Sequence, residues 1–182
     1  MTARPPGRVL GAVLAGGRSS RFGSDKAQAR IGGRSLLERA AAEIAPWCDA
    51  VVIVGRAGGV PDLPTPGLGP LGGIAGALDH ALGHGFTTVL TTACDMPALP
   101  DGLAAALLRR APAYCREAPV LGHWPAALGA HLLAHLEIAP DRSIVRWAQA
   151  VGALPVAATG PLPNVNTPAD LADMVSTVML VP

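Results

Sequence analysis

The fold is decided by the stretch Leu14-Ala15-Gly16-Gly17-Arg18-Ser19-Ser20-Arg21-Phe22-Gly23-Ser24-Asp25-Lys26, which directly follows the apolar run of residues 9–14. This order is typical of a buried strand that leads into a phosphate-binding loop, because paired glycines let backbone amides approach anionic oxygens closely. Arg21 and Lys26 add positive charge that can reach phosphates. A Walker loop is excluded, since Gly-Lys-Ser/Thr does not follow a glycine at the required spacing.

Beyond this stretch, short β-branched runs alternate with longer segments rich in Ala and Leu, which is the pattern of βαβ units on a mostly parallel sheet. We expect strands at residues 9–14, 50–54, 87–92, 119–123 and 154–157. We expect helices at residues 35–44, 72–82, 102–109, 126–136, 143–151 and 168–175. Thr167, Pro168 and Asp170 predict the start of the last helix through a capping box. The sequence therefore predicts the α/β class.

Length and composition favour one folded domain. The chain has 182 residues, of which 50% are hydrophobic and 15% charged, so a substantial core can form. A formal net charge of +1 gives no broad basic field for nucleic acid, so we expect an anionic ligand to be held by a local cluster. No apolar run approaches the ~18 residues that span a bilayer, and we expect no membrane partner.

Cysteine usage indicates a reducing compartment. Cys48, Cys94 and Cys115 are odd in number and widely spaced, which favours neither a disulfide framework nor a zinc knuckle. Arg4 and Arg8 precede an apolar run and so resemble a secretory signal, but cleavage there would destroy the glycine stretch. We therefore expect a cytoplasmic protein.

A carboxylate follows the third expected strand, in Thr91-Thr92-Ala93-Cys94-Asp95-Met96-Pro97. In an open α/β sheet, ligands bind outside the carboxyl ends of the strands, and Asp95 stands at such an end. Mg²⁺ takes one or two carboxylates and completes its shell with water and phosphate oxygens, so Asp95 is a candidate Mg²⁺ ligand. The alternative is an aspartate that only caps the next turn.

The Pro- and Gly-rich segment 55–73 predicts a loop folded over a site. Its Gly67-Leu68-Gly69-Pro70-Leu71-Gly72 matches G-x-G-x-x-G, but it follows a Pro-rich loop rather than a strand, so we interpret it as a tight turn into a helix. Asp62 in this loop could accept hydrogen bonds from a guanine edge or a ribose. It could equally be a solvated loop aspartate.

Two amides alternate in Asn164-Val165-Asn166-Thr167-Pro168, so in an extended segment both face one side. Asn164 and Asn166 are therefore candidates for binding polar ligand atoms, the alternative being turn-forming asparagines.

The remaining candidate groups are histidines and tryptophans. The pairs His80/His84 and His131/His135 have i, i+4 spacing, but both lack the Glu of H-E-x-x-H and a third ligand nearby, which argues against zinc. The three tryptophans, Trp47, Trp124 and Trp147, are expected to pack in the core rather than to stack on bases.

Four blocks together resemble the molybdenum cofactor guanylyltransferase family: residues 14–26, Gly69-Pro70-Leu71-Gly72-Gly73-Ile74, Cys94-Asp95-Met96-Pro97 and Asn164-Val165-Asn166-Thr167-Pro168-Ala169-Asp170-Leu171. Their order and spacing run nearly from end to end. The resemblance implies a Rossmann-like three-layer nucleotidyltransferase fold with a mostly parallel sheet, spanning residues 1–182 as one domain. It places a nucleotide-binding part at about residues 8–110 and a pterin-side part at about 111–182.

The resemblance also implies roles for individual residues. Nucleotide contacts fall on Leu14, Ala15, Gly16 and Asp62, with Gly17 in the phosphate loop. Arg21, Lys26 and Asp95 form the catalytic set, in which Lys26 meets phosphates and Asp95 binds Mg²⁺. Independently of these roles, we expect the pterin over the carboxyl-terminal third of the chain, near Asn164 and Asn166 and near Arg142 or Arg146. Two departures from the family pattern are Phe22, where methionine is usual, and the segment 54–56, which lacks an asparagine that some members have near the nucleoside.

The implied activity is transfer of GMP from GTP to molybdopterin with release of pyrophosphate, with transient contacts to the enzymes that supply molybdopterin and accept the product. Cytidylyltransferases for the same cofactor typically carry Ala where Gly16 stands and lack the Gly-Pro-Leu block, and sugar-phosphate nucleotidyltransferases usually continue with Gly-Thr-Arg. These siblings remain alternatives. A non-catalytic carrier of nucleotide or cofactor is the alternative from a different class.

Overall fold

The computed structural model describes residues 7–16, 25–138 and 141–179. Within these ranges, six strands form the main sheet in the order β4-β1-β5-β7-β6-β8. They are β1 (Val9–Leu14), β4 (Ala50–Val54), β5 (Thr88–Ala93), β6 (Ala113–Cys115), β7 (Gly122–Pro125) and β8 (Leu154–Val156). Strand β7 runs antiparallel to both of its neighbours, and the other pairs are parallel. The expected mostly parallel α/β architecture is confirmed.

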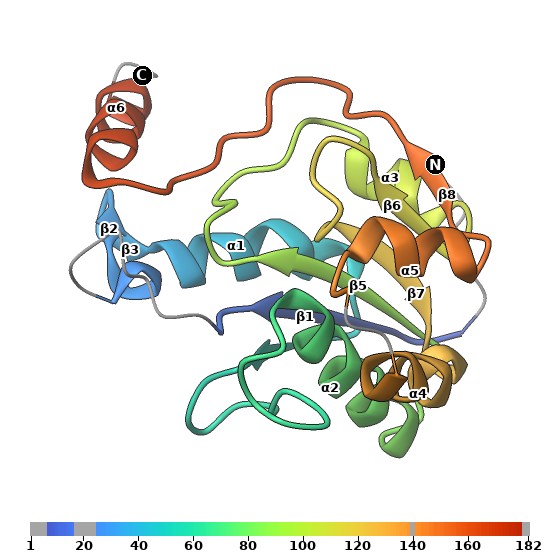
Figure 1. The fold of residues 1–182 in the computed structure, drawn as a ribbon. Coiled ribbons are helices and arrows are strands. Elements are labelled where there is room, and N and C mark those ends of the chain that lie inside the picture. The colour runs from blue at the N-terminus through green and yellow to red at the C-terminus, as the bar shows by residue number, and fades with distance from the viewer. Residues whose placement is uncertain (1–6, 17–24, 139–140, 180–182) are drawn as a thin grey trace.

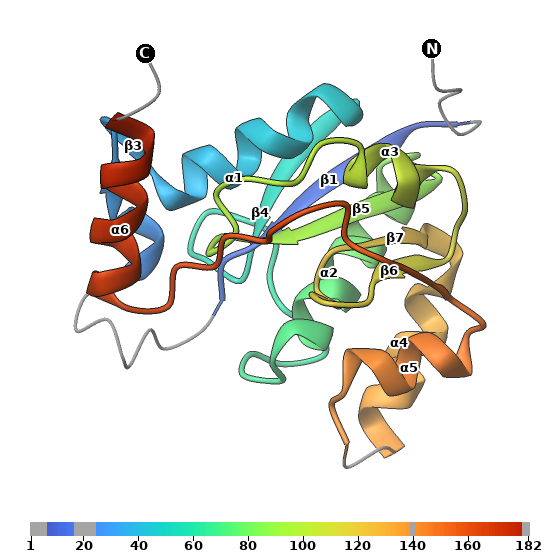
Figure 2. The ribbon, with the colours of Figure 1, turned by 90° about the horizontal axis from the view of Figure 1, so that it is seen from above.

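Helices cover both faces of this sheet and make three layers (Figures 1 and 2). On one face lie α2 (Pro70–Gly83), α4 (Gly129–Ile138) and α5 (Ile144–Ala150), and on the other lie α1 (Leu36–Ile44) and α3 (Leu103–Leu108). Both faces of β1 are buried. Leu10 packs in the core on the side of α2, and Val9 packs in the core on the side of α1. That double burial explains why β1 is continuously apolar instead of alternating.

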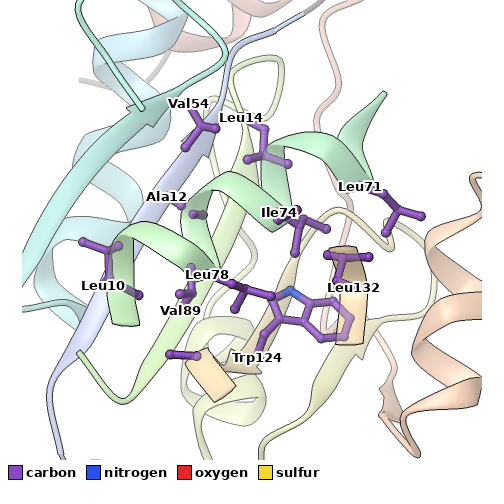
Figure 3. Close-up of a cluster of buried hydrophobic side chains, with 14 of the residues drawn as sticks. Leu10, Ala12, Leu14, Val54, Leu71, Ile74, Leu78, Val89, Trp124 and Leu132 are labelled. Atoms are coloured by element: carbon purple, nitrogen blue, oxygen red, sulfur yellow. The ribbon is translucent and has the colours of Figure 1, made fainter. Parts of the chain in front are cut away.

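The core between the sheet and α2 is built around Trp124 (Figure 3). Ile74 and Leu78 of α2 belong to the same fully buried cluster as Leu10 of β1. Trp124 and Trp147 are both 0% exposed, and their ring centroids lie 4.8 Å apart. The expectation of core tryptophans is therefore confirmed for these two, while Trp47 is only half-buried.

A small unit stands beside the sheet, at the end where β1 and β5 finish (Figure 1). It combines the hairpin of β2 (Arg30–Ile31) and β3 (Arg34–Ser35) with α6 (Pro168–Met179). Ile31, Leu36 and Val165 form its buried centre, packed against Leu171 and Met174 of α6. An extended strap of residues 157–167 leads from β8 to α6 and crosses the molecule (Figure 2). The strap thereby returns the end of the chain to the carboxyl ends of the strands.

Most predicted elements are confirmed, with shifted bounds. Helix α2 begins at Pro70 rather than at residue 72, because Gly69 at φ +70° makes the turn and proline suits the first helical position. The expected strand at 119–123 begins only at Gly122, since residues before it form a turn closed by Leu121 N–H on the Ala118 carbonyl, 2.9 Å. The expected helix at 126–136 is divided into the 3₁₀ helix η3 (Ala126–Leu128) and α4.

Five short elements of the described chain were not predicted. They are β2, β3, β6 and the 3₁₀ helices η1 (Lys26–Gln28) and η2 (Ala45–Trp47). Each has two or three residues, too few to show a hydrophobic period. No helix of the described chain is long and apolar enough to cross a membrane.

Candidate functional site

A cleft of about 520 Å³ opens at the carboxyl ends of β1 and β5. The two strands are parallel neighbours in register from Val9 opposite Thr88 to Leu14 opposite Ala93, so the residues that follow them meet at one edge. Strand β4, the next strand of the sheet along the chain, pairs with one side of β1, and β5 pairs with the other side. The strand order therefore reverses direction at β1, and open α/β sheets bind ligands at such a switch point. Lining residues include Leu14, Gly16, Asp62, Gly73, Cys94 and Asp95.

Glycines bring two strand ends into close contact on one side of this cleft. A Cβ on Gly55 would lie 2.8 Å from Cα of Gly16, and Gly55 has φ +81°. A Cβ on Gly16 would lie 3.3 Å from Oδ2 of Asp62. The backbone after β1 is thus packed against the backbone after β4 and against the Asp62 carboxylate, which explains the absence of side chains there.

Asp62 lines the cleft from the loop between β4 and α2. The backbone N–H of Leu63 donates to the carbonyl of Gly72 in α2, 3.0 Å, and this bond holds the loop beside the helix. Burial raises the pKa of the Asp62 carboxyl. The structure therefore places Asp62 against the glycines of the cleft, and the nucleotide contact that the resemblance implies for it stays a prediction.

Lys26, Asp95 and Asn166 come together across almost the whole chain. Nζ of Lys26 donates to Oδ2 of Asp95 at 3.1 Å and to Oδ1 of Asn166 at 2.9 Å. The backbone N–H of Val165 donates to the carbonyl of Asp95, 3.0 Å, so the strap is fixed to the turn after β5. One ammonium group therefore joins three segments beside Asp95, which lines the cleft.

Local structure explains why a short helix begins at Lys26. The 3₁₀ helix η1 (Lys26–Gln28) starts at Lys26 because the Asp25 carboxylate accepts the backbone N–H of Ala27, 3.2 Å. Guanidinium nitrogens of Arg56 donate to both oxygens of that carboxylate, and this contact is the main reason that the pKa of Asp25 is lowered. The contribution of Arg56 was not foreseen, since nothing in the sequence pairs residues 31 positions apart.

The capping box predicted for α6 is present. Oδ2 of Asp170 accepts the backbone N–H groups of Thr167 at 2.8 Å and of Asn166 at 2.7 Å, and Oγ1 of Thr167 accepts the N–H of Asp170 at 3.2 Å. Val165 is buried between the exposed Asn164 and Asn166, as the alternation predicted. The Asn166 side chain accepts a hydrogen bond from Lys26, and Asn164 lies two residues earlier on the strap.

Cys94 was not singled out from the sequence, yet it lines the cleft next to Asp95. Burial, and next the charge of Asp95, raises the pKa of the Cys94 thiol to about 11. The thiol therefore stays protonated at neutral pH and acts as a small, weakly polar part of the wall.

The donor chemistry of Asp95, at the carboxyl end of β5, is compatible with a divalent cation. Asp95 presents a carboxylate to an open cleft, the donor that Mg²⁺ prefers when substrate phosphates complete its shell. Among the described residues, no group of three or more His, Cys, Asp or Glu side chains could hold a metal. His80 and His84 stack on each other with ring centroids 3.9 Å apart.

The remaining predicted residues differ in their placement. Ala15 is buried, and its N–H donates to the carbonyl of Val54 at 2.9 Å, so this amide is used within the sheet. Leu14 and Gly16 line the cleft. Gly17 and Arg21 lie outside the described residues.

Residues 11–154 match the family model of the MobA-like NTP transferase domain. The chain belongs to the MobA-like NTP transferase family. A molybdenum cofactor guanylyltransferase from Rhodobacter capsulatus is 38% identical over 91% of this chain and 94% of its own length. Another from Rhizobium leguminosarum bv. trifolii is 35% identical over 91% of this chain and 90% of its own.

Solved structures share the fold of this MobA-like transferase. Molybdopterin-guanine dinucleotide biosynthesis protein A from Archaeoglobus fulgidus superposes with a TM-score of 0.74 at 20% identity, covering 93% of this chain and 98% of that one. The 2-C-methyl-D-erythritol 4-phosphate cytidylyltransferase from Thermus thermophilus gives 0.69 at 18% identity, covering 94% and 98%. The fold is thus an α/β nucleotidyltransferase fold, as the resemblance implied, and the expected family is confirmed.

Proposed function

We propose that this chain transfers GMP from GTP to the terminal phosphate of molybdopterin and releases pyrophosphate. The observation that carries the proposal is the meeting of Lys26 and Asp95 at the cleft after β1 and β5. Relatives that match over nine-tenths of this chain are named molybdenum cofactor guanylyltransferases, which supports guanine as the base and molybdopterin as the acceptor.

The chemistry needs positioning and charge neutralisation rather than a covalent enzyme intermediate. The acceptor phosphate attacks the α-phosphorus of GTP, the bond to the bridging oxygen breaks, and pyrophosphate leaves with that bonding pair. Lys26 would neutralise phosphate charge, and Gly16 lines the cleft in which the nucleotide would lie. Arg21, five residues before Lys26 in the sequence, is proposed to bind the same phosphates.

We further propose Mg²⁺ as the cofactor, held by Asp95 and by phosphate oxygens of the substrate. When bound, this cation would neutralise negative charge on the triphosphate and help to orient it. The support is the chemistry of the donor: one carboxylate at the mouth of an open cleft.

Base and pterin contacts are proposed for Asp62 and for the strap. Asp62, half-buried in the cleft wall, could accept N–H groups of the guanine edge, and a buried unpaired partner can reject a wrong base by roughly 10⁴-fold. Asn164 is proposed to face molybdopterin. A cytoplasmic location and transient contacts with supplying and accepting enzymes stay predictions.

The test is Mg²⁺-dependent pyrophosphate release from GTP or CTP, with molybdopterin supplied on its carrier enzyme. Release with GTP is expected. Release with CTP alone would identify a cytidylyltransferase, and GTP binding without release would identify a carrier.

Two substitutions tie the reaction to the site. Asp95→Ala and Lys26→Ala should each lower turnover by at least ~100-fold. Lys26→Ala removes a hydrogen-bond donor to the transition state, which typically costs about 3–4 kcal/mol, and Asp95→Ala removes the carboxylate proposed to hold Mg²⁺. Circular dichroism should show an unchanged fold. Turnover near the wild-type rate in Asp95→Ala would contradict the metal assignment.

A further inference from the structure

Arg56 lies just beyond β4 and is tied to the residue that precedes Lys26. Its Nη1 donates to Oδ1 of Asp25 at 2.9 Å, and its Nη2 donates to Oδ2 of the same carboxylate. Both oxygens are used, so the guanidinium fixes the direction of the Asp25 carboxylate as well as its distance. The Arg56 side chain is only 27% exposed.

Asp25 passes this constraint to η1. The Oδ1 atom that Arg56 holds also accepts the N–H of Ala27, 3.2 Å, and thereby caps the first turn of η1. Lys26 is the first residue of that turn, and Ala27, the next, is 2% exposed. A change in the Asp25 carboxylate would therefore move the backbone from which the Lys26 side chain extends.

The end of β4 makes a second contact with the same functional region. The carbonyl of Val54 accepts the N–H of Ala15 at 2.9 Å, and Gly55 packs against Gly16. Arg56 follows Gly55 directly. The last turn of β4 thus supports the residues after β1 through its backbone and the start of η1 through the Arg56 side chain.

We propose that Arg56 is a positioning residue for the phosphate-binding Lys26, acting through the Asp25 carboxylate. The inference rests on the proposed function for its kinetic readout. Arg56 holds η1 where Nζ of Lys26 reaches Asp95 and Asn166. A lysine in its place could not repeat the two parallel hydrogen bonds, because an ammonium is a point charge without the planar fork.

A role in stability alone predicts a different result. The Asp25 carboxylate is 43% exposed, and a partly exposed ion pair typically contributes no more than about 1 kcal/mol to the free energy of unfolding, so removing Arg56 should leave the fold intact. Misplacing a catalytic group by about 1 Å can lower a rate ~100-fold. The two roles are separated by comparing kinetics with melting temperature.

The experiment is a double-mutant cycle. Arg56→Ala and Asp25→Asn should each lower kcat/KM for GTP by about 10–100-fold, and Arg56→Lys should recover only part of it. In a Lys26→Ala background, Arg56→Ala should add no further loss of GTP affinity, measured by direct binding where turnover is too slow. The matched control is Arg8→Ala, which removes an arginine at the opposite edge of the sheet, where it contacts His84 and Phe86.

The outcomes are distinct. Wild-type turnover of GTP tests the proposed function by itself. With an active wild type, an unchanged kcat/KM in Arg56→Ala would overturn the positioning role, and so would losses that add in full to those of Lys26→Ala. A fall in melting temperature that accounts for the kinetic loss, with kcat/KM restored on cooling, would also overturn it, because cooling refolds a protein that has only been destabilised.

Discussion

Nζ of Lys26 lies 3.1 Å from Oδ2 of Asp95, so the carboxylate proposed for Mg²⁺ is already neutralised by a cation of the protein. A metal ion bound to Asp95 would lie close to the Lys26 ammonium, and the two positive charges would repel each other. The metal ion must therefore either tolerate this repulsion or bind after the ammonium has moved toward a phosphate. We therefore expect divalent cations to bind weakly until the nucleotide is present.

Lys26→Met should tighten binding of Mn²⁺ to the nucleotide-free protein by roughly ten-fold, because the competing charge is removed while the length of the side chain is kept. Titration calorimetry or Mn²⁺ electron paramagnetic resonance measures this affinity without any turnover. Asp95→Asn is the matched control and should weaken Mn²⁺ binding, because it removes the proposed carboxylate ligand. Equal Mn²⁺ affinity in the wild type and Lys26→Met would contradict the competition.

The two strap asparagines should affect different substrates. Asn166→Ala removes the second acceptor of Lys26, so KM for GTP should rise by about 3–10-fold, which corresponds to about 0.7–1.4 kcal/mol and lies within the usual net contribution of one hydrogen bond. Asn164→Ala leaves Lys26 in place, and its effect should fall on KM for molybdopterin. Steady-state kinetics with each substrate varied in turn measures the split. The same KM change in both variants would contradict it.

The pairing of residues far apart in sequence was the part of the site that could not be predicted. The strand ends were predictable because β1 and β5 are apolar runs followed by Gly16 and Asp95. The contacts of Lys26 with Asn166 and of Arg56 with Asp25 depend on how the strap and the β4 turn pack. No local propensity encodes those distances, whereas the α6 cap, which is local, was predicted from three residues.

Glycines at positive φ offer a matched steric test. Gly55 and Gly58 have φ of +81° and +79°, but only at Gly55 would a Cβ meet backbone, at 2.8 Å from Gly16 Cα. Gly58→Ala should cost about 1 kcal/mol in the free energy of unfolding from its backbone alone. Gly55→Ala should cost about 2–4 kcal/mol because overpacking is added.

Urea unfolding measures the two costs, and GTP binding shows whether the cleft is disturbed. We expect Gly55→Ala to weaken GTP binding and Gly58→Ala to leave it unchanged. Equal unfolding costs would mean that the contact between the ends of β1 and β4 relaxes freely.

The Asp62 carboxyl makes a prediction about pH. Burial raises its pKa in the folded protein above the unfolded value of about 3.9. Between those two pKa values the folded state binds more protons than the unfolded state, so stability falls as pH rises through this window and stays lower above it. Removing the charge should therefore stabilise the nucleotide-free protein at neutral pH.

Asp62→Asn should raise the melting temperature at pH 7 by about 1–3 °C, and the gain should shrink as the pH falls through the raised pKa of the Asp62 carboxyl. The control Asp79→Asn changes an exposed carboxylate on α2 that has no comparable burial cost. Because the same charge is proposed to pair with the guanine edge, Asp62→Asn should also weaken the preference for GTP over CTP. If Asp62→Asn gains stability yet keeps the full preference for GTP over CTP, burial of the Asp62 charge destabilises the protein but the charge does not recognise guanine. Base selection would then have to come from backbone groups of the cleft.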